Sequence, residues 1–111
     1  MTVKELRDGN IVLHSGKFYI LDSFDIYKLD TTNCEDVQPI ELTEEILLKC
    51  GFVKDEFDNW ENETRLGLYK PEEFDGYLSV WGESTVGECN YLHQLQNLYY
   101  ALTGQELEIN L

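Results

Sequence analysis

The segment from Cys89 to Gly104 carries the strongest secondary-structure signal in the chain. Its apolar side chains recur every three or four residues, which is the spacing of an α-helix that buries one face. A glycine directly after such a pattern favours helix termination, because glycine readily adopts the left-handed backbone conformation of a C-terminal cap. We therefore predict a helix from Cys89 or Asn90 to Thr103. The side chains expected to face a sheet are Leu92, Leu95, Leu98, Tyr99 and Leu102.

Three short strands are predicted in the N-terminal part of the chain. Alternation of apolar and polar side chains predicts strands over Asn10–His14, Lys17–Asp22 and Ser23–Leu29. Ser15-Gly16 suits a two-residue hairpin turn, since glycine accepts the positive φ that such a turn requires. Consecutive strands at this spacing are typical of a meander, including a small SH3-like barrel. The predicted core of this β unit consists of Ile11, Leu13, Phe18, Ile20 and Ile26.

The middle of the chain contains a predicted loop and a predicted short helix. The loop, Asp30–Gln38, is polar and acidic. Thr43 is a favourable N-cap, and the two glutamates that follow it suit the positive end of a helix dipole. Gly51 is placed to end this helix after Cys50. Its buried stripe is expected to consist of Ile46, Leu47 and Cys50.

Further strands are predicted on either side of the C-terminal helix. The segments concerned are a strand that begins at Phe52 and Val53, a hairpin of Thr64–Lys70 with Tyr77–Gly82, and a short last strand over Glu106–Leu111. Residues 57–60 suit a tight turn, and residues 82–87 are expected to form a loop. Together these elements predict a single α+β domain over residues 1–111. In it, an antiparallel meander packs on the long C-terminal helix, with a short helix between the strand groups.

Charge is distributed unevenly along the chain, whose formal net charge is −14. The first 29 residues are neutral, whereas Asp30–Glu63 contains eleven acids and two lysines and so carries −9. From Glu72 onward there are seven acids and no Lys or Arg. Such a chain repels nucleic acid and attracts basic surfaces. Its 13% aromatic content argues against intrinsic disorder, because disordered acidic chains are poor in aromatic residues.

Cysteine usage and hydropathy predict a soluble cytoplasmic protein. Cys34, Cys50 and Cys89 are odd in number and widely spaced, as in reduced intracellular proteins rather than in disulfide frameworks. The N-terminal residues lack the apolar region of a secretory signal. No apolar run approaches the roughly 20 residues that cross a bilayer, so no membrane contact is expected.

Neither catalysis nor a cofactor is predicted. Cys89 and His93 lie four residues apart on the predicted helix, which provides half of a zinc site. The same pair is the local candidate for thiolate chemistry, since a helix N-terminus lowers a thiol pKa. The simpler interpretation is a packed thiol and a surface imidazole. We therefore predict a non-enzymatic protein without a metal, and retain a Cys/His-based enzyme or small-ligand binder as an alternative.

Two surfaces are candidates for partner binding. The acidic candidates, which would contact a basic partner electrostatically, are Glu35, Asp36, Asp55, Glu56, Asp58 and Glu61. The second candidate is the uncharged polar face of the C-terminal helix, where the proposed contacts are His93, Gln94, Asn97 and Tyr100. Such a face suits the centre of an interface, where charge is depleted. The alternatives are an acidic surface that only aids solubility and a helix that packs on both sides within the domain.

Three segments of the chain resemble a family of small uncharacterised proteins from phages and prophages of Bacteroidetes bacteria. They are Glu5–Val12, with the sequence ELRDGNIV, Pro39–Phe52, with PIELTEEILLKCGF, and Tyr91–Leu107, with YLHQLQNLYYALTGQEL. The resemblance spans nearly the whole chain in the same order. It implies an accessory protein of a mobile element that works inside a bacterium, and it transfers no activity and no functional residues.

These observations predict a phage-encoded acidic binding protein that inhibits a host defence factor, such as a CRISPR effector. Its partner is expected to be a basic, nucleic-acid-binding protein. The alternative is a phage accessory or assembly module that binds another phage protein, or itself as a homo-oligomer, through the C-terminal helix.

Overall fold

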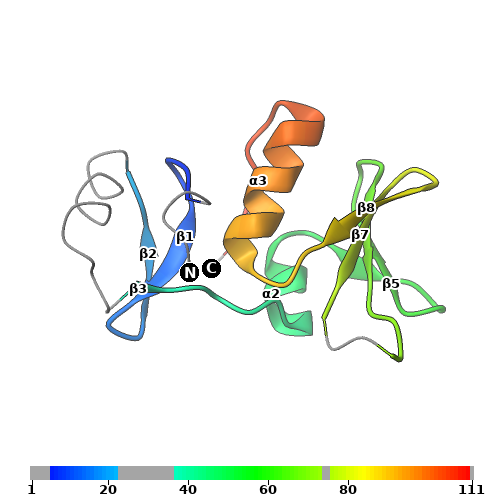
Figure 1. Cartoon of the computed structure of the whole chain (residues 1–111), viewed down its shortest axis with the longest axis horizontal. Coiled ribbons are helices and arrows are strands. Elements are labelled where there is room, and N and C mark those ends of the chain that lie inside the picture. The colour runs from blue at the N-terminus through cyan, green and yellow to red at the C-terminus, as the bar shows by residue number, and fades with distance from the viewer. Residues whose placement is uncertain (1–5, 23–36, 74–75, 111) are drawn as a thin grey trace.

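Helix α3 (Leu92–Thr103) lies between two antiparallel sheets in the computed structural model, which describes residues 6–22, 37–73 and 76–110 (Figure 1). The sheets occupy opposite ends of the long axis of a molecule that measures 44 × 28 × 24 Å. A short helix, α2 (Glu44–Lys49), lies close to α3 between the sheets. The predicted α+β class is therefore confirmed, and neither sheet closes into a barrel within the described residues.

The N-terminal sheet has the strand order β2-β1-β3. Its strands are β1 (Ile11–His14), β2 (Lys17–Ile20) and β3 (Val37–Gln38). The predicted hairpin of β1 and β2 is confirmed, with positive φ angles of 50° at Ser15 and 80° at Gly16. The prediction of a loop up to Gln38 is wrong at its end, because β3 pairs with β1. The predicted strand Ser23–Leu29 lies outside the described residues.

The predicted core of this sheet is wrong in two of its members. Phe18 is 47% exposed and Ile20 is 66% exposed, whereas Val12, on the other face, is completely buried. The reason is position within the sheet: β2 is the strand of this hairpin that lies farther from α3, so α3 does not cover its side chains. Strand β1 is instead buried on both faces, with Ile11 in the main core and Val12 in a smaller cluster with Leu21. Leu13 is half-buried, and Ile26 lies outside the described residues.

Helix α2 (Glu44–Lys49) confirms the prediction made from its caps. The Thr43 side chain accepts a hydrogen bond from the Ile46 amide at 3.2 Å, which satisfies one of the unpaired amides of the first turn. Gly51 follows the helix with a φ of 84°. The buried stripe is Ile46, Leu47 and Cys50, as expected.

The C-terminal sheet has five strands in the order β4-β5-β6-β7-β8. They are β4 (Val53–Lys54), β5 (Asn59–Glu61), β6 (Leu66–Tyr69), β7 (Leu78–Trp81) and β8 (Ser84–Glu88). The predicted hairpin of β6 and β7 is confirmed. Two predictions are wrong, because Asn59 and Trp60 belong to a strand rather than a turn, and residues 84–88 form a strand rather than a loop. The pairing of β7 with β8 is irregular at Ser79/Val80, which obscured the alternation expected of a strand.

Helix α3 (Leu92–Thr103) ends at Gly104, whose φ is 73°. Leu92, Leu95 and Tyr99 are buried as predicted, whereas Leu98 and Leu102 are only half-buried. The main core joins both sheets and both helices through Ile11, Leu47, Phe52, Trp60, Leu66, Leu68, Leu92 and Leu95. After α3 the chain is extended rather than in the predicted strand, and Leu107 anchors it in this core. The core is thus shared by elements from the whole length of the chain.

Candidate functional site

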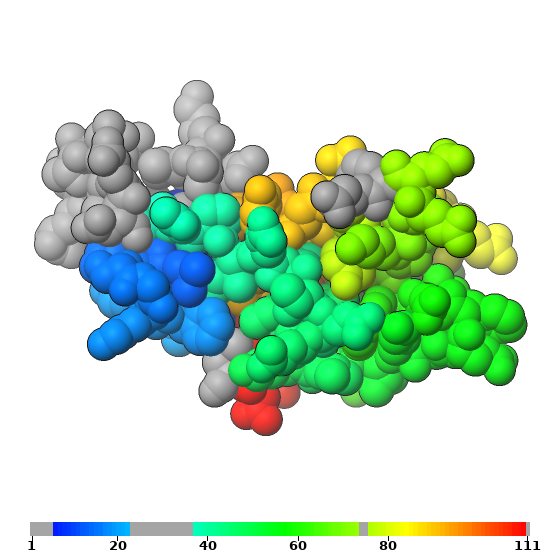
Figure 2. Space-filling model, turned by 90° about the horizontal axis from the view of Figure 1, so that it is seen from below, coloured from blue at the N-terminus to red at the C-terminus, as the bar shows by residue number. Residues whose placement is uncertain are grey.

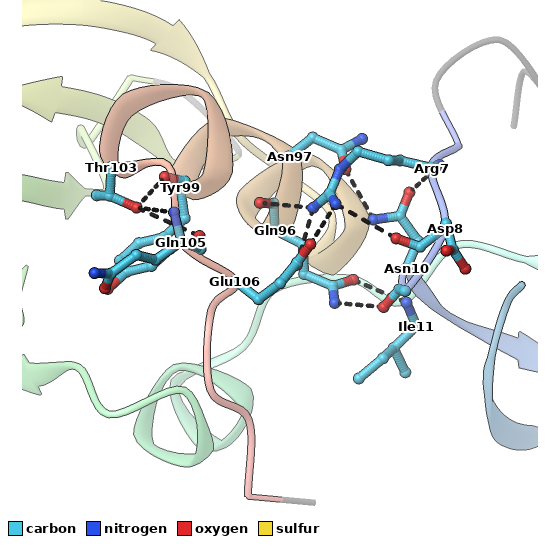
Figure 3. A network of polar contacts seen from close by, with 11 residues as sticks. Arg7, Asp8, Asn10, Ile11, Gln96, Asn97, Tyr99, Thr103, Gln105 and Glu106 are labelled. Carbon is cyan, nitrogen blue, oxygen red and sulfur yellow. Dashed lines mark hydrogen bonds and ion pairs between the residues drawn. The ribbon is translucent and has the colours of Figure 1, made fainter.

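The uncharged face of α3 binds the N-terminal segment of the same chain (Figure 3). Gln96 is 3% exposed, and its side-chain carbonyl accepts a hydrogen bond from the Ile11 amide at 2.8 Å. The Gln96 side-chain amide donates to the Gly9 carbonyl at 3.0 Å. One buried glutamine therefore satisfies a backbone donor and a backbone acceptor at the entrance to β1. A charged side chain here would have to be desolvated, which explains why the face is neutral.

Asn97 extends these contacts to Asn10 and Arg7. Its side-chain oxygen accepts from Asn10 Nδ2 at 2.8 Å and from Arg7 Nε at 3.1 Å. Asn10 is completely buried, and its side-chain oxygen accepts from the Arg7 amide at 2.6 Å. We refer to Arg7, Asn10, Gln96, Asn97 and Glu106 as the α3 polar network. Its geometry fixes the chain that leads into the N-terminal sheet.

Glu106 closes the network from the C-terminal side. Its two carboxylate oxygens accept from Arg7 Nη1 at 2.5 Å and Nη2 at 3.1 Å, and the guanidinium lies 4.4 Å from the centre of the Tyr100 ring. The hydrogen bond from Arg7 lowers the pKa of Glu106, and the same bond raises the pKa of Arg7. Both side chains are partly exposed, so this ion pair is a modest, salt-dependent contribution to stability.

The four helix-face residues predicted to contact a partner are largely engaged within the fold. His93 is completely buried, so the expectation of a surface imidazole is wrong. The Gln94 side chain accepts from the amides of Asn90 and Tyr91 at 3.0 and 3.2 Å, which caps the start of α3. Asn97 belongs to the α3 polar network, and Tyr100 is 44% exposed beside Arg7. The alternative of a helix packed on both sides within the domain describes this arrangement.

The acidic turn between β4 and β5 is tightly built. The Asp55 carboxylate accepts from the amides of Phe57 and Asn59 at 2.8 and 3.0 Å, and the bonds from Asn59 and Phe57 lower the pKa of Asp55. Asp58 has a left-handed φ of 64° and lies 3.3 Å from Lys54 Nζ, which also lies 3.1 Å from Glu44. Asp55 and Asp58 therefore have structural roles.

Two of the remaining acidic candidates lie on the surface, and an exposed aromatic ring lies next to one of them. Glu56 and Glu61 are exposed, in the turn and in β5 respectively. Glu35 and Asp36 lie outside the described residues. Phe57, which sequence reasoning treated only as part of a turn, is 75% exposed between Glu56 and Asp58. The turn thus presents an aromatic ring flanked by carboxylates.

The two described cysteines are buried thiols. Cys89 is 1% exposed and Cys50 is 4% exposed, and burial raises the pKa of each to about 12. A thiol nucleophile requires the opposite shift, so the local environment of Cys89 disfavours the Cys89–His93 alternative. The described part of the chain brings no group of three or more His, Cys, Asp or Glu side chains into a metal-binding arrangement.

A cleft of about 720 Å³ lies between the end of α2, the turn at Asn62 and Glu63, and residues 105–110. The extended C-terminal chain forms one wall, where the Asn110 amide donates to the Lys49 carbonyl at 2.8 Å. Figure 2 shows these C-terminal residues, in red, beside the cyan-green region that contains α2. No sequence pattern marked this cleft, because its walls come from three separate segments.

Comparisons of the chain with family models, curated proteins and solved structures give no match. Across residues 6–22, 37–73 and 76–110, no helix combines the length and the apolar character required to cross a membrane. The support for the candidate binding surfaces therefore comes from the geometry of this chain and not from similarity to a known protein.

Proposed function

We propose that this protein is a non-catalytic acidic binding protein whose partner is a basic, nucleic-acid-binding protein. The observation that carries the proposal is the β4–β5 turn, which holds Phe57 at 75% exposure between acidic residues. A well-ordered turn loses little conformational freedom on binding, so an aromatic ring on it is a favourable anchor. The sequence resemblance supports the biological setting, a phage-encoded inhibitor of a host defence factor such as a CRISPR effector.

Charge and the exposed ring have separate roles in this proposal. The net charge of −14 attracts a basic partner over long range and so raises the association rate. The Phe57 ring fills an apolar pocket of the partner and slows dissociation. Carboxylates such as Glu56 and Glu61 would bind the Lys and Arg residues with which the partner normally contacts the phosphates of its nucleic acid.

The alternative of binding through the C-terminal helix has less support, because Gln94 and Asn97 already have partners within the chain. A helix-mediated complex would have to use Tyr100, which is 44% exposed. A second copy of this chain is also repelled by its own charge at low salt.

The test is affinity capture from a bacterial host lysate at low and high salt, followed by kinetics on the captured partner. The variants are Phe57→Ala and Glu56→Gln/Glu61→Gln, with Glu72→Gln/Glu73→Gln as a control of equal charge change. We expect Phe57→Ala to speed dissociation by about tenfold and Glu56→Gln/Glu61→Gln to slow association several-fold at low salt. Capture of only non-basic proteins, or kinetics identical for all variants, would contradict the proposal.

A further inference from the structure

The cleft beside α2 has the size of a binding site and fixed walls. Its volume of about 720 Å³ lies within the range of roughly 300–1,000 Å³ that is typical of ligand clefts. The C-terminal wall is held at three points: Glu106 binds Arg7, Leu107 is 8% exposed in the core, and the Asn110 amide binds the Lys49 carbonyl. The cleft is therefore present before any ligand arrives.

Carboxylates from two different walls set the charge of the cleft. Glu63 comes from the β5–β6 turn and Glu108 from the C-terminal chain, and both are exposed. Neither forms an ion pair with a residue that the structure describes. The Lys49 ammonium, which also lines the cleft, lies 3.7 Å from Glu45. The cleft therefore favours a cation and disfavours an anion.

Apolar surface accompanies these carboxylates. Leu48 is 59% exposed at the end of α2, and Ile109 is half-buried on the opposite wall. Long cationic side chains bury their methylene stems on apolar surface while the charged group stays near water and carboxylates. The combination matches an arginine or lysine side chain better than a small inorganic cation.

We infer that this cleft binds an extended, arginine- or lysine-bearing peptide segment of the basic partner. The inference rests on the proposed function, because that function supplies a basic partner. It adds a second contact with the partner, separate from the Phe57 turn, and places that contact in the cleft beside α2. Glu63 and Glu108 would hold the cationic groups, and Leu48 and Ile109 would contact the stems.

The test is fluorescence anisotropy with a fluorescein-labelled oligoarginine peptide at low ionic strength. The cleft variant is Glu63→Gln/Glu108→Gln, and the matched control, Glu72→Gln/Glu73→Gln, removes the same amount of charge elsewhere. A third variant, Gln105→Trp, fills the cleft without altering charge, since Gln105 is an exposed lining residue. We expect about tenfold weaker binding for the cleft variant, about fivefold for Gln105→Trp, and less than about threefold for the control.

The possible results separate this inference from the proposed function. Equal weakening by the cleft variant and the control means that only the overall charge attracts the peptide, and it overturns the cleft assignment. Absence of binding to the unmodified protein also overturns it. In both cases the capture experiment and the Phe57→Ala kinetics still decide the proposed function. Urea denaturation of each variant verifies that the fold is intact before its binding is interpreted.

Discussion

Replacement of Gln96 by Leu tests whether the α3 polar network holds the N-terminal sheet in place. Leucine is similar in size but removes both hydrogen bonds, to the Ile11 amide at 2.8 Å and to the Gly9 carbonyl at 3.0 Å. The Ile11 amide is buried, so leaving it unsatisfied costs about 1–3 kcal/mol, and the half-buried Gly9 carbonyl adds a smaller amount. Burial of the apolar leucine offsets part of this loss. We expect a net destabilisation of about 1–3 kcal/mol.

Urea denaturation followed by the fluorescence of Trp60 and Trp81 measures this loss. With a typical slope for a chain of this size, the midpoint should fall by about 1–2 M urea. The matched control is Gln105→Leu, which makes the same substitution at an exposed position and should change stability by less than about 0.5 kcal/mol. Hydrogen exchange should show lost protection at the Ile11 amide. A loss below about 1 kcal/mol with that amide still protected would refute the reasoning.

Three further predictions follow from burial and charge. Phe52→Ala should cost about 3–5 kcal/mol because Phe52 is 1% exposed, whereas Phe18→Ala should cost no more than about 1 kcal/mol because Phe18 is 47% exposed; urea denaturation of both variants compares them. Burial raises the pKa of Cys50 and Cys89 from the ordinary value of 9.0 to about 12. Their contribution to stability is therefore complete below pH 9 and is lost as the pH rises toward 12, which thermal melts of the protein with unalkylated thiols measure. Glu106 has a pKa lowered from 4.5, so its contribution is present above that pH and lost below it; Glu106→Gln should remove this acid-side dependence and cost at most about 1 kcal/mol at neutral pH, a difference that disappears in high salt.

Local signals predicted the elements whose causes are local. Thr43 and Gly51 bound α2, Ser15-Gly16 turns the first hairpin, and Gly104 ends α3, and in each case the decisive residues are adjacent in sequence. Elements that depend on long-range pairing were missed. Strand β3 has only two residues and exists because β1 pairs with it, and β8 is interrupted by an irregular pairing with β7.

The candidate sites show the same limit. The exposure of Phe18 and the burial of Val12 depend on which of the two strands lies nearer to α3. The alternation of apolar and polar residues along β1 and β2 does not reveal this position. The neutral face of α3 was recognised from composition, but its occupants, Arg7 and Asn10, lie far away in sequence. The cleft beside α2 depends on where residues 105–110 return to the helix, so the sequence alone did not indicate it.

The position of α3 between the sheets sets the order in which the chain can acquire its structure during translation. Both sheets leave the ribosome before residues 92–107, yet Ile11 in one sheet and Leu68 in the other belong to the same core as Leu92 and Leu107. Until that helix emerges, the inner faces of two short sheets are exposed to chaperones and to other nascent chains. The two halves therefore complete folding in one late step, and a translational pause placed after β8 would lengthen the period of greatest vulnerability.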